Sequence, residues 1–263
     1  MPLFRALLLL VVTALASPAL AQNGTSGGTS AGSNDGPTIV AGVKSAANQV
    51  ATYLEVSAKA GKRPDLSKPP ISALFNQVFD AQRLAALPQP TAQDVMWLAN
   101  STAAANQVNK AILFFGITQP VDLIADGAAI KRNMTDFEDQ QTVALSFLIR
   151  IAARQTQSMF LFMDQLQPEQ RTPIREEGFN KARVGAAEMV YGALTTIAQG
   201  MKPENDRLLS AAIRDTRDVW AVDIFPKDRP QVLATLAAAQ KATKDDETYR
   251  NLAAFSAALT AAK

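Results

Sequence analysis

The sequence contains neither cysteine nor histidine among its 263 residues. These absences exclude Ser-His and Cys-His catalytic sites, disulfide bonds, and zinc sites built from thiolate or imidazole ligands. A haem or iron–sulfur centre would also lack its usual ligands. Stability must therefore come from a packed hydrophobic core, which a chain of this length can form. We expect no cofactor, no metal site and no catalytic residue.

The chain also lacks a strong charge of either sign. Its 26 Lys and Arg residues are balanced by 24 Asp and Glu residues, so the net charge is only +2. Nucleic-acid-binding proteins generally concentrate basic residues on one face. No such basic surface is expected here, and we therefore predict no nucleic-acid partner.

The first 21 residues have the order of features found in a secretory signal peptide. Arg5 is followed by an uncharged apolar run of about 11 residues, whereas a bilayer-spanning helix needs roughly 20. Ser17-Pro18 ends the run, and Ala19-Leu20-Ala21 is a small-x-small cleavage site. We predict removal of residues 1–21, a periplasmic or secreted product, and no integral membrane segment after signal removal.

Residues 22–38 are rich in Gly, Ser and Thr and predict a disordered tether. From residue 39 to residue 263 the apolar residues recur every three or four positions, which predicts a single helical domain. A subdivision near residues 117–120 remains open. The expected helices cover 39–60, 71–87, 91–115, 120–130, 135–166, 173–201, 203–224, 230–242 and 245 to the end of the chain.

Capping residues mark several of these ends. Thr91, with Asp94 three residues later, predicts a variant capping box, and Gly116 suits a C-terminal cap. Asp228 and Asp245 are expected to cap the last two helices at their N-termini. Strand signals are nearly absent, so the predicted fold class is all-α.

Two long helices, 135–166 and 173–201, predict a central helical hairpin within a multi-helix bundle. The first carries a seam at alternating three- and four-residue steps, and apolar residues outside the seam favour a position surrounded by other helices. One side reserved for a partner is the alternative. The second has Gly178, Gly185 and Gly192 at intervals of seven, which predicts close approach of a neighbouring backbone.

Two groups of residues are candidates for a site. The first would hold an apolar small molecule between helices; its members are Trp97, Phe114, Met159, Phe162 and Tyr191. The second is a buried polar pair that Glu188 forms with Arg150 or Arg154, and Arg183 is a further possible partner of Glu188. Glu55 also stands in an apolar context. Asp136, Glu138 and Asp139 could bind an oxygen-preferring cation, but they fit better as acids favouring a helix N-terminus.

The leading hypothesis for function is an exported, non-catalytic helical protein of the cell envelope. It would act by binding a partner protein or by self-association. The alternative is a carrier that holds an apolar small molecule between its helices. A third hypothesis is a hydrolase that uses carboxylates such as Glu188 and Asp164.

Overall fold

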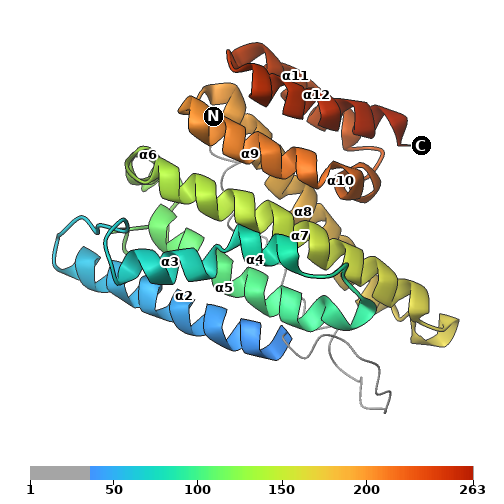
Figure 1. Cartoon of the computed structure of the whole chain (residues 1–263), viewed down its shortest axis with the longest axis horizontal. Helices are drawn as coiled ribbons and strands as arrows, with labels where there is room; N and C mark the ends of the chain where they lie inside the picture. Colours follow the sequence, from blue (N-terminus) through green and yellow to red (C-terminus); the bar gives the residue numbers. More distant parts are fainter. Residues whose placement is uncertain (1–35, 263) are drawn as a thin grey trace.

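The computed structural model describes residues 36–262, and these fold into helices with no strand in that range. The all-α prediction is therefore confirmed (Figure 1). The α-helices are α2 (Gly36–Lys59), α3 (Ile71–Val78), α4 (Ala81–Ala86), α5 (Val95–Leu113), α6 (Gly127–Asp136), α7 (Glu138–Gln165), α8 (Pro173–Gln199), α9 (Pro203–Asp215), α10 (Arg217–Asp223), α11 (Arg229–Ala242) and α12 (Asp246–Ala261). Two short 3-10 helices, η2 (Ala92–Asp94) and η3 (Pro168–Gln170), precede α5 and α8.

The predicted signal peptide and most of the predicted tether lie outside the described residues. The last part of the tether does not: α2 begins at Gly36, so residues 36–38 belong to the first helix. Pro37 is compatible with this start, because the first turn of a helix has no internal use for the N–H that proline lacks.

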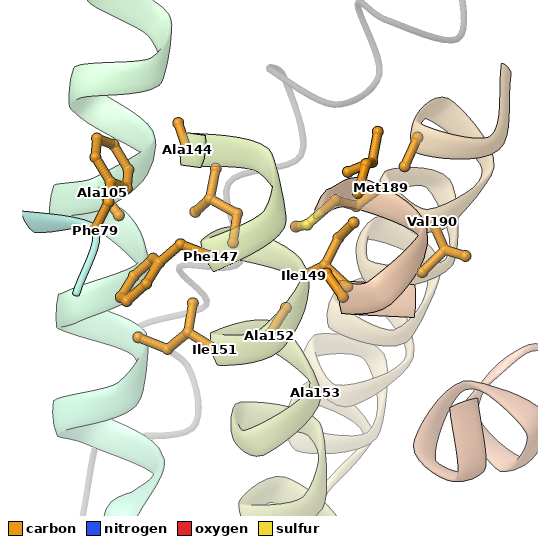
Figure 2. Close-up of a cluster of buried hydrophobic side chains, with 14 of the residues drawn as sticks. Phe79, Ala105, Ala144, Phe147, Ile149, Ile151, Ala152, Ala153, Met189 and Val190 are labelled. Atoms are coloured by element: carbon orange, nitrogen blue, oxygen red, sulfur yellow. The ribbon is translucent and has the colours of Figure 1, made fainter. Parts of the chain in front are cut away.

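Helix α7 lies in the middle of the bundle, between an N-terminal layer formed by α2 to α5 and a C-terminal layer formed by α9 to α12 (Figure 1). It packs on α5 and η2 on one side and on α8 and α9 on the other, while α2 covers α5 and α12 covers α9. Figure 2 shows Phe147 directed toward α5 and Ile149 directed toward Met189 and Val190 of α8. The predicted central position of this helix is confirmed.

Helices α7 and α8 form the central hairpin, joined by the turn that contains η3. The buried positions of α7 occur on most of its circumference, which explains why a purely amphipathic pattern was absent. They are Thr142, Ala144, Ser146, Phe147, Leu148, Ile149, Ile151, Ala152, Ala153, Gln155, Thr156, Ser158, Met159 and Met163. No helix within residues 36–262 combines the length and the apolar character needed to cross a bilayer.

Several predicted caps are present. The hydroxyl and backbone of Thr91 form the predicted box with Asp94, and Asp245 accepts a hydrogen bond from the Thr248 N–H. Gly116 has a left-handed backbone, with φ of 71°, directly after α5. Asp228 precedes α11, but its side chain makes no capping hydrogen bond, so that part of the prediction is wrong.

Two of the expected helices are each divided into two shorter helices, for a common reason. The expected helix 71–87 is interrupted after Val78, because the Asp80 carboxylate accepts from Arg83 N–H and starts α4. The expected helix 203–224 breaks at Thr216, whose hydroxyl donates to the Ala212 carbonyl at 2.7 Å and accepts from the buried Trp220. Side-chain hydrogen bonds to nearby backbone compete with helix continuation at such positions.

The helix expected at 120–130 instead begins at Gly127 and continues to Asp136. Asp122 accepts hydrogen bonds from the N–H groups of Ile124 and Ala125, which holds the chain in a turn after Pro120. The segment between α5 and α6 carries Ile117, Val121 and Leu123 onto a small apolar cluster around Leu113 and Ile130. A division of the domain near 117–120 stays a prediction.

Gly178, Gly185 and Gly192 are all buried in α8. We expect Gly185→Leu to lower the free energy of unfolding by about 1–3 kcal/mol, because a large side chain would overpack this face although leucine favours helix more than glycine does. Urea unfolding followed by circular dichroism measures the change. Val184→Leu, at the neighbouring exposed position, is the control and should change little. Equal stability of Gly185→Leu and the wild type would contradict the predicted close approach.

Candidate functional site

The five residues proposed to hold an apolar molecule lie in different parts of the bundle. Only two of them come together: Met159 is buried against Val95 and Ala182, and Phe162 packs on the same cluster. Phe114 belongs to the small cluster beneath the α5–α6 connection. Trp97 packs on the main core and donates its indole N–H to Asp94 at 2.6 Å. Tyr191 is half-buried on α8.

The two arginines expected beside Glu188 make contacts with other elements. Arg150 forms an ion pair with Asp215 at 3.0 Å, which links α7 to the end of α9. Arg154 donates to the Pro88 carbonyl, and burial lowers the pKa of its guanidinium. Glu188 is half-buried on α8. Its pairing with either arginine stays a prediction.

The other acidic candidates lie at or near the surface, and most of them bind a nearby lysine. Glu55 is exposed and pairs with Lys59 at 2.6 Å, which lowers the pKa of the glutamate. Asp164 is exposed near the end of α7. Glu138 accepts from the Lys202 backbone N–H at 2.9 Å, and Asp139 pairs with the Lys202 ammonium at 2.7 Å. These contacts fasten the start of α7 to the start of α9. Within residues 36–262, no group of three or more potential ligand side chains is placed to hold a metal ion.

The most enclosed charged contact joins Arg183 of α8 to Asp223 at the end of α10. The Asp223 side chain is completely buried, and its Oδ1 accepts from Arg183 Nε at 3.0 Å. The same guanidinium donates to the Val222 and Asp223 carbonyls, at 3.2 and 2.7 Å, and so caps the C-terminus of α10. Cationic side chains at a helix C-terminus are stabilised by the carbonyl groups left free there.

Three phenylalanine rings surround this guanidinium. Its central carbon lies 4.1 Å from the ring centre of Phe225, 5.3 Å from that of Phe160 and 5.7 Å from that of Phe179. Phe160 and Phe179 meet edge to face, with ring centres 5.0 Å apart. Cation–π contacts of this kind strengthen when the groups are removed from water. The arrangement fixes α10 against the α7–α8 hairpin.

Burial raises the pKa of Asp223 to about 6, although the charge and hydrogen bond of Arg183 act in the opposite direction. The second carboxylate oxygen, Oδ2, has no hydrogen-bond partner. Sequence reasoning missed this pair, but a signal for it exists: Asp223 lies inside the otherwise apolar run Trp220-Ala-Val-Asp-Ile-Phe225. Because this contact joins α8 to the end of α10, we call the Arg183–Asp223 pair the anchor between these helices.

A shallow cavity of about 310 Å³ lies between the loop after α2 and the α6–α7 junction. It is lined by residues 63–67 and by Asp136, Phe137 and Gln140. Arg63 covers the Phe137 ring and donates to the Asp136 carbonyl at 2.5 Å. Asp65 is bound by the Ser67 hydroxyl and by Lys68, and these contacts lower its pKa to about 2. These polar groups already satisfy one another, so a ligand would have to displace their contacts.

The end of the α7–α8 hairpin projects beyond the neighbouring helices (Figure 1). The residues from Gln167 to Ile174 are all exposed. Two apolar side chains flank this polar turn: Leu161, which is 42% exposed, and Ile174, which is 65% exposed. The end of the hairpin therefore combines an aromatic base, the contact of Phe160 with Phe179, with apolar side chains in water.

Comparisons with protein-family profiles, with characterised proteins and with solved structures gave no match to this chain.

Replacing Arg183 by methionine tests the anchor. We expect Arg183→Met to lower the free energy of unfolding by about 3 kcal/mol at pH 7.5, because it leaves the buried Asp223 carboxylate without its cation. The folded pKa of Asp223 lies above the ordinary 3.8, so its contribution to stability is present at low pH and is lost as the pH rises through about 6. The loss caused by the substitution should therefore be smaller at pH 5.

Urea titrations at the two pH values measure this difference. Lys181→Met is the matched control, since Lys181 lies on the same helix in an exposed pair with Glu177 and should contribute less than about 1 kcal/mol. An equal loss for Arg183→Met at pH 5 and pH 7.5 would show that Asp223 does not take up a proton in this range.

Proposed function

We propose that this protein is exported and acts as a non-catalytic helical binding module of the cell envelope. Its partner is another protein or a second copy of the chain, and the contact is made through the end of the α7–α8 hairpin. The observation that carries the proposal is the projection of this end with Leu161 and Ile174 in water. Burying one such side chain in an interface is worth about 1.5–3 kcal/mol.

The packing of side chains at the base of the hairpin supports the proposal. The Phe160–Phe179 contact joins the two helices close to the exposed end, and Arg183 ties both rings to α10. A surface that is ordered before binding loses less conformational entropy when a partner docks. The packing at its base therefore favours a hairpin end that is ordered before a partner binds.

The proposal of export rests on the N-terminal sequence alone. Arg5, the short apolar run and Ala19-Leu20-Ala21 follow one another in the order of a signal peptide. We expect the full-length protein, produced in a secreting bacterial host, to appear outside the cytoplasm with Gln22 as its first residue. Cell fractionation and intact-mass measurement check this. A cytoplasmic product that retains Met1 would contradict it.

The binding role is tested at the exposed hairpin residues. Light scattering on the purified protein detects self-association, and a photo-crosslinker placed at position 174 in producing cells detects a partner. We expect a discrete oligomer or one specific crosslinked protein, and we expect Ile174→Glu to weaken that association at least about tenfold.

Ile124→Glu serves as the control for added charge. Ile124 is 94% exposed on the α5–α6 connection, away from the hairpin end, so its substitution should leave the association unchanged. A strictly monomeric protein with no specific crosslink from position 174 would contradict the proposal. Equal weakening by both substitutions would contradict the assignment of the surface.

A further inference from the structure

Asp206, in the first turns of α9, is a buried carboxylate at the junction of three helices. The residue is only 6% exposed, and its Oδ1 has no hydrogen-bond partner. Glu138 of α7 and Asp245, the N-cap of α12, are close enough to repel it. A carboxylate that loses water without gaining a donor or a cation is costly when ionised.

The cationic residues closest to Asp206 in the sequence, Lys202 and Arg207, bind other acids. Lys202 bonds to Asp139 at 2.7 Å, and Arg207 pairs with Asp245 at 3.2 Å. Asn205, the preceding residue, directs its amide to Glu138 at 2.8 Å and to Asp139 at 2.9 Å. Among the described residues, the Oδ1 of Asp206 is therefore left without a cation or a donor.

The remaining charged groups around the junction do not supply a cation for Asp206. Glu204, on the same turn of α9, adds another negative charge near Lys202. The part of α8 that follows Glu188, residues 189–199, contains no Asp, Glu, Lys or Arg. The neighbouring carboxylates Asp139 and Asp245 hold lowered pKa values, because hydrogen bonds from Lys202 and from the Thr248 N–H favour their ionised forms. On acidification, Asp206 takes up a proton before either of these two.

We propose that Asp206 is a pH-dependent switch that controls the contact between α7, α9 and α12. When the carboxyl is protonated, the three helix ends close around a neutral group. When it is ionised, it repels Glu138 and Asp245 and loosens the attachment of the C-terminal layer to α7. The burial and the two neighbouring acids raise the pKa of Asp206 to about 6, so the change falls between mildly acidic and neutral pH.

The sign of the effect follows from linkage. A folded-state pKa above the ordinary 3.8 means that the folded protein binds the proton more tightly than the unfolded chain does. The stabilisation is fully present below about pH 4 and is lost as the pH rises through about 6. Carboxylates with lowered pKa values, such as Asp65, lose their contribution only in more acidic solution. Between pH 4.5 and pH 7.5, changes in stability therefore report on the carboxyl groups whose pKa values are raised.

Asp223 titrates in the same window and supplies the comparison. We would measure the melting temperature of the full chain at several pH values for the wild type, Asp206→Asn, Asp223→Asn and the double variant. Asparagine imitates the shape of the protonated acid. We expect the wild type to gain several degrees from pH 7.5 to pH 5, and Asp206→Asn to melt about 5 °C higher than the wild type at pH 7.5. The double variant should show almost no dependence on pH.

Hydrogen exchange locates the effect. After correction for the intrinsic rates, amides in the first turns of α9 and α12 should be better protected at pH 5 than at pH 7.5 in the wild type. In Asp206→Asn, protection should be high at both pH values, whereas Asp223→Asn should retain the change at this junction. An Asp206→Asn variant with the same pH dependence as the wild type would overturn the proposal. Carboxyl-carbon NMR of the wild type gives a result that does not depend on any variant, and a pKa near 4 for Asp206 would also overturn it.

Discussion

The need to cover α7 on nearly all sides determines the layered arrangement of the bundle. Phe147 and Ile149 are only two residues apart, yet Figure 2 shows them directed toward α5 and α8 respectively. Both are buried. A helix with apolar residues on opposite faces leaves hydrophobic surface in water unless other helices pack on both. The N-terminal and C-terminal layers therefore both pack on α7.

Charged contacts then determine how the C-terminal layer is placed. Arg150 of α7 reaches Asp215 at the junction between α9 and α10, and Arg183 of α8 reaches Asp223 at the end of α10. Buried ion pairs often add little net stability, because both groups lose water. Here the ion pairs determine where the helices lie, because the guanidinium of Arg183 holds the C-terminus of α10 against α8. Asp206 differs from these residues, since the cations beside it bind other acids.

The positions of the helices could be predicted from the sequence better than the contacts between the helices. Apolar spacing and caps such as Thr91 with Asp94 depend on residues a few positions apart, so a single sequence contains them. The break at Thr216 was missed because one hydroxyl competes locally with the helix. The Arg183–Asp223 contact joins residues 40 positions apart. Periodicity indicates which face of a helix is buried, but not what that face meets. For the same reason the sequence did not show that the five proposed ligand-binding residues lie in different parts of the bundle, with only Met159 and Phe162 in one cluster.

The two carboxyl groups with raised pKa values make the packing of the layers depend on pH. Asp206 and Asp223 both lie in the C-terminal layer and both face the central hairpin or its start, and burial is the largest cause of each raised pKa. Asp65 and Asp139, whose pKa values are lowered, lie near the surface and pair with exposed lysines. Acidification from neutral pH to about 5 therefore changes charge at the interior contacts before it changes these surface pairs. The attachment of the C-terminal layer is the part of the fold that such a change reaches first.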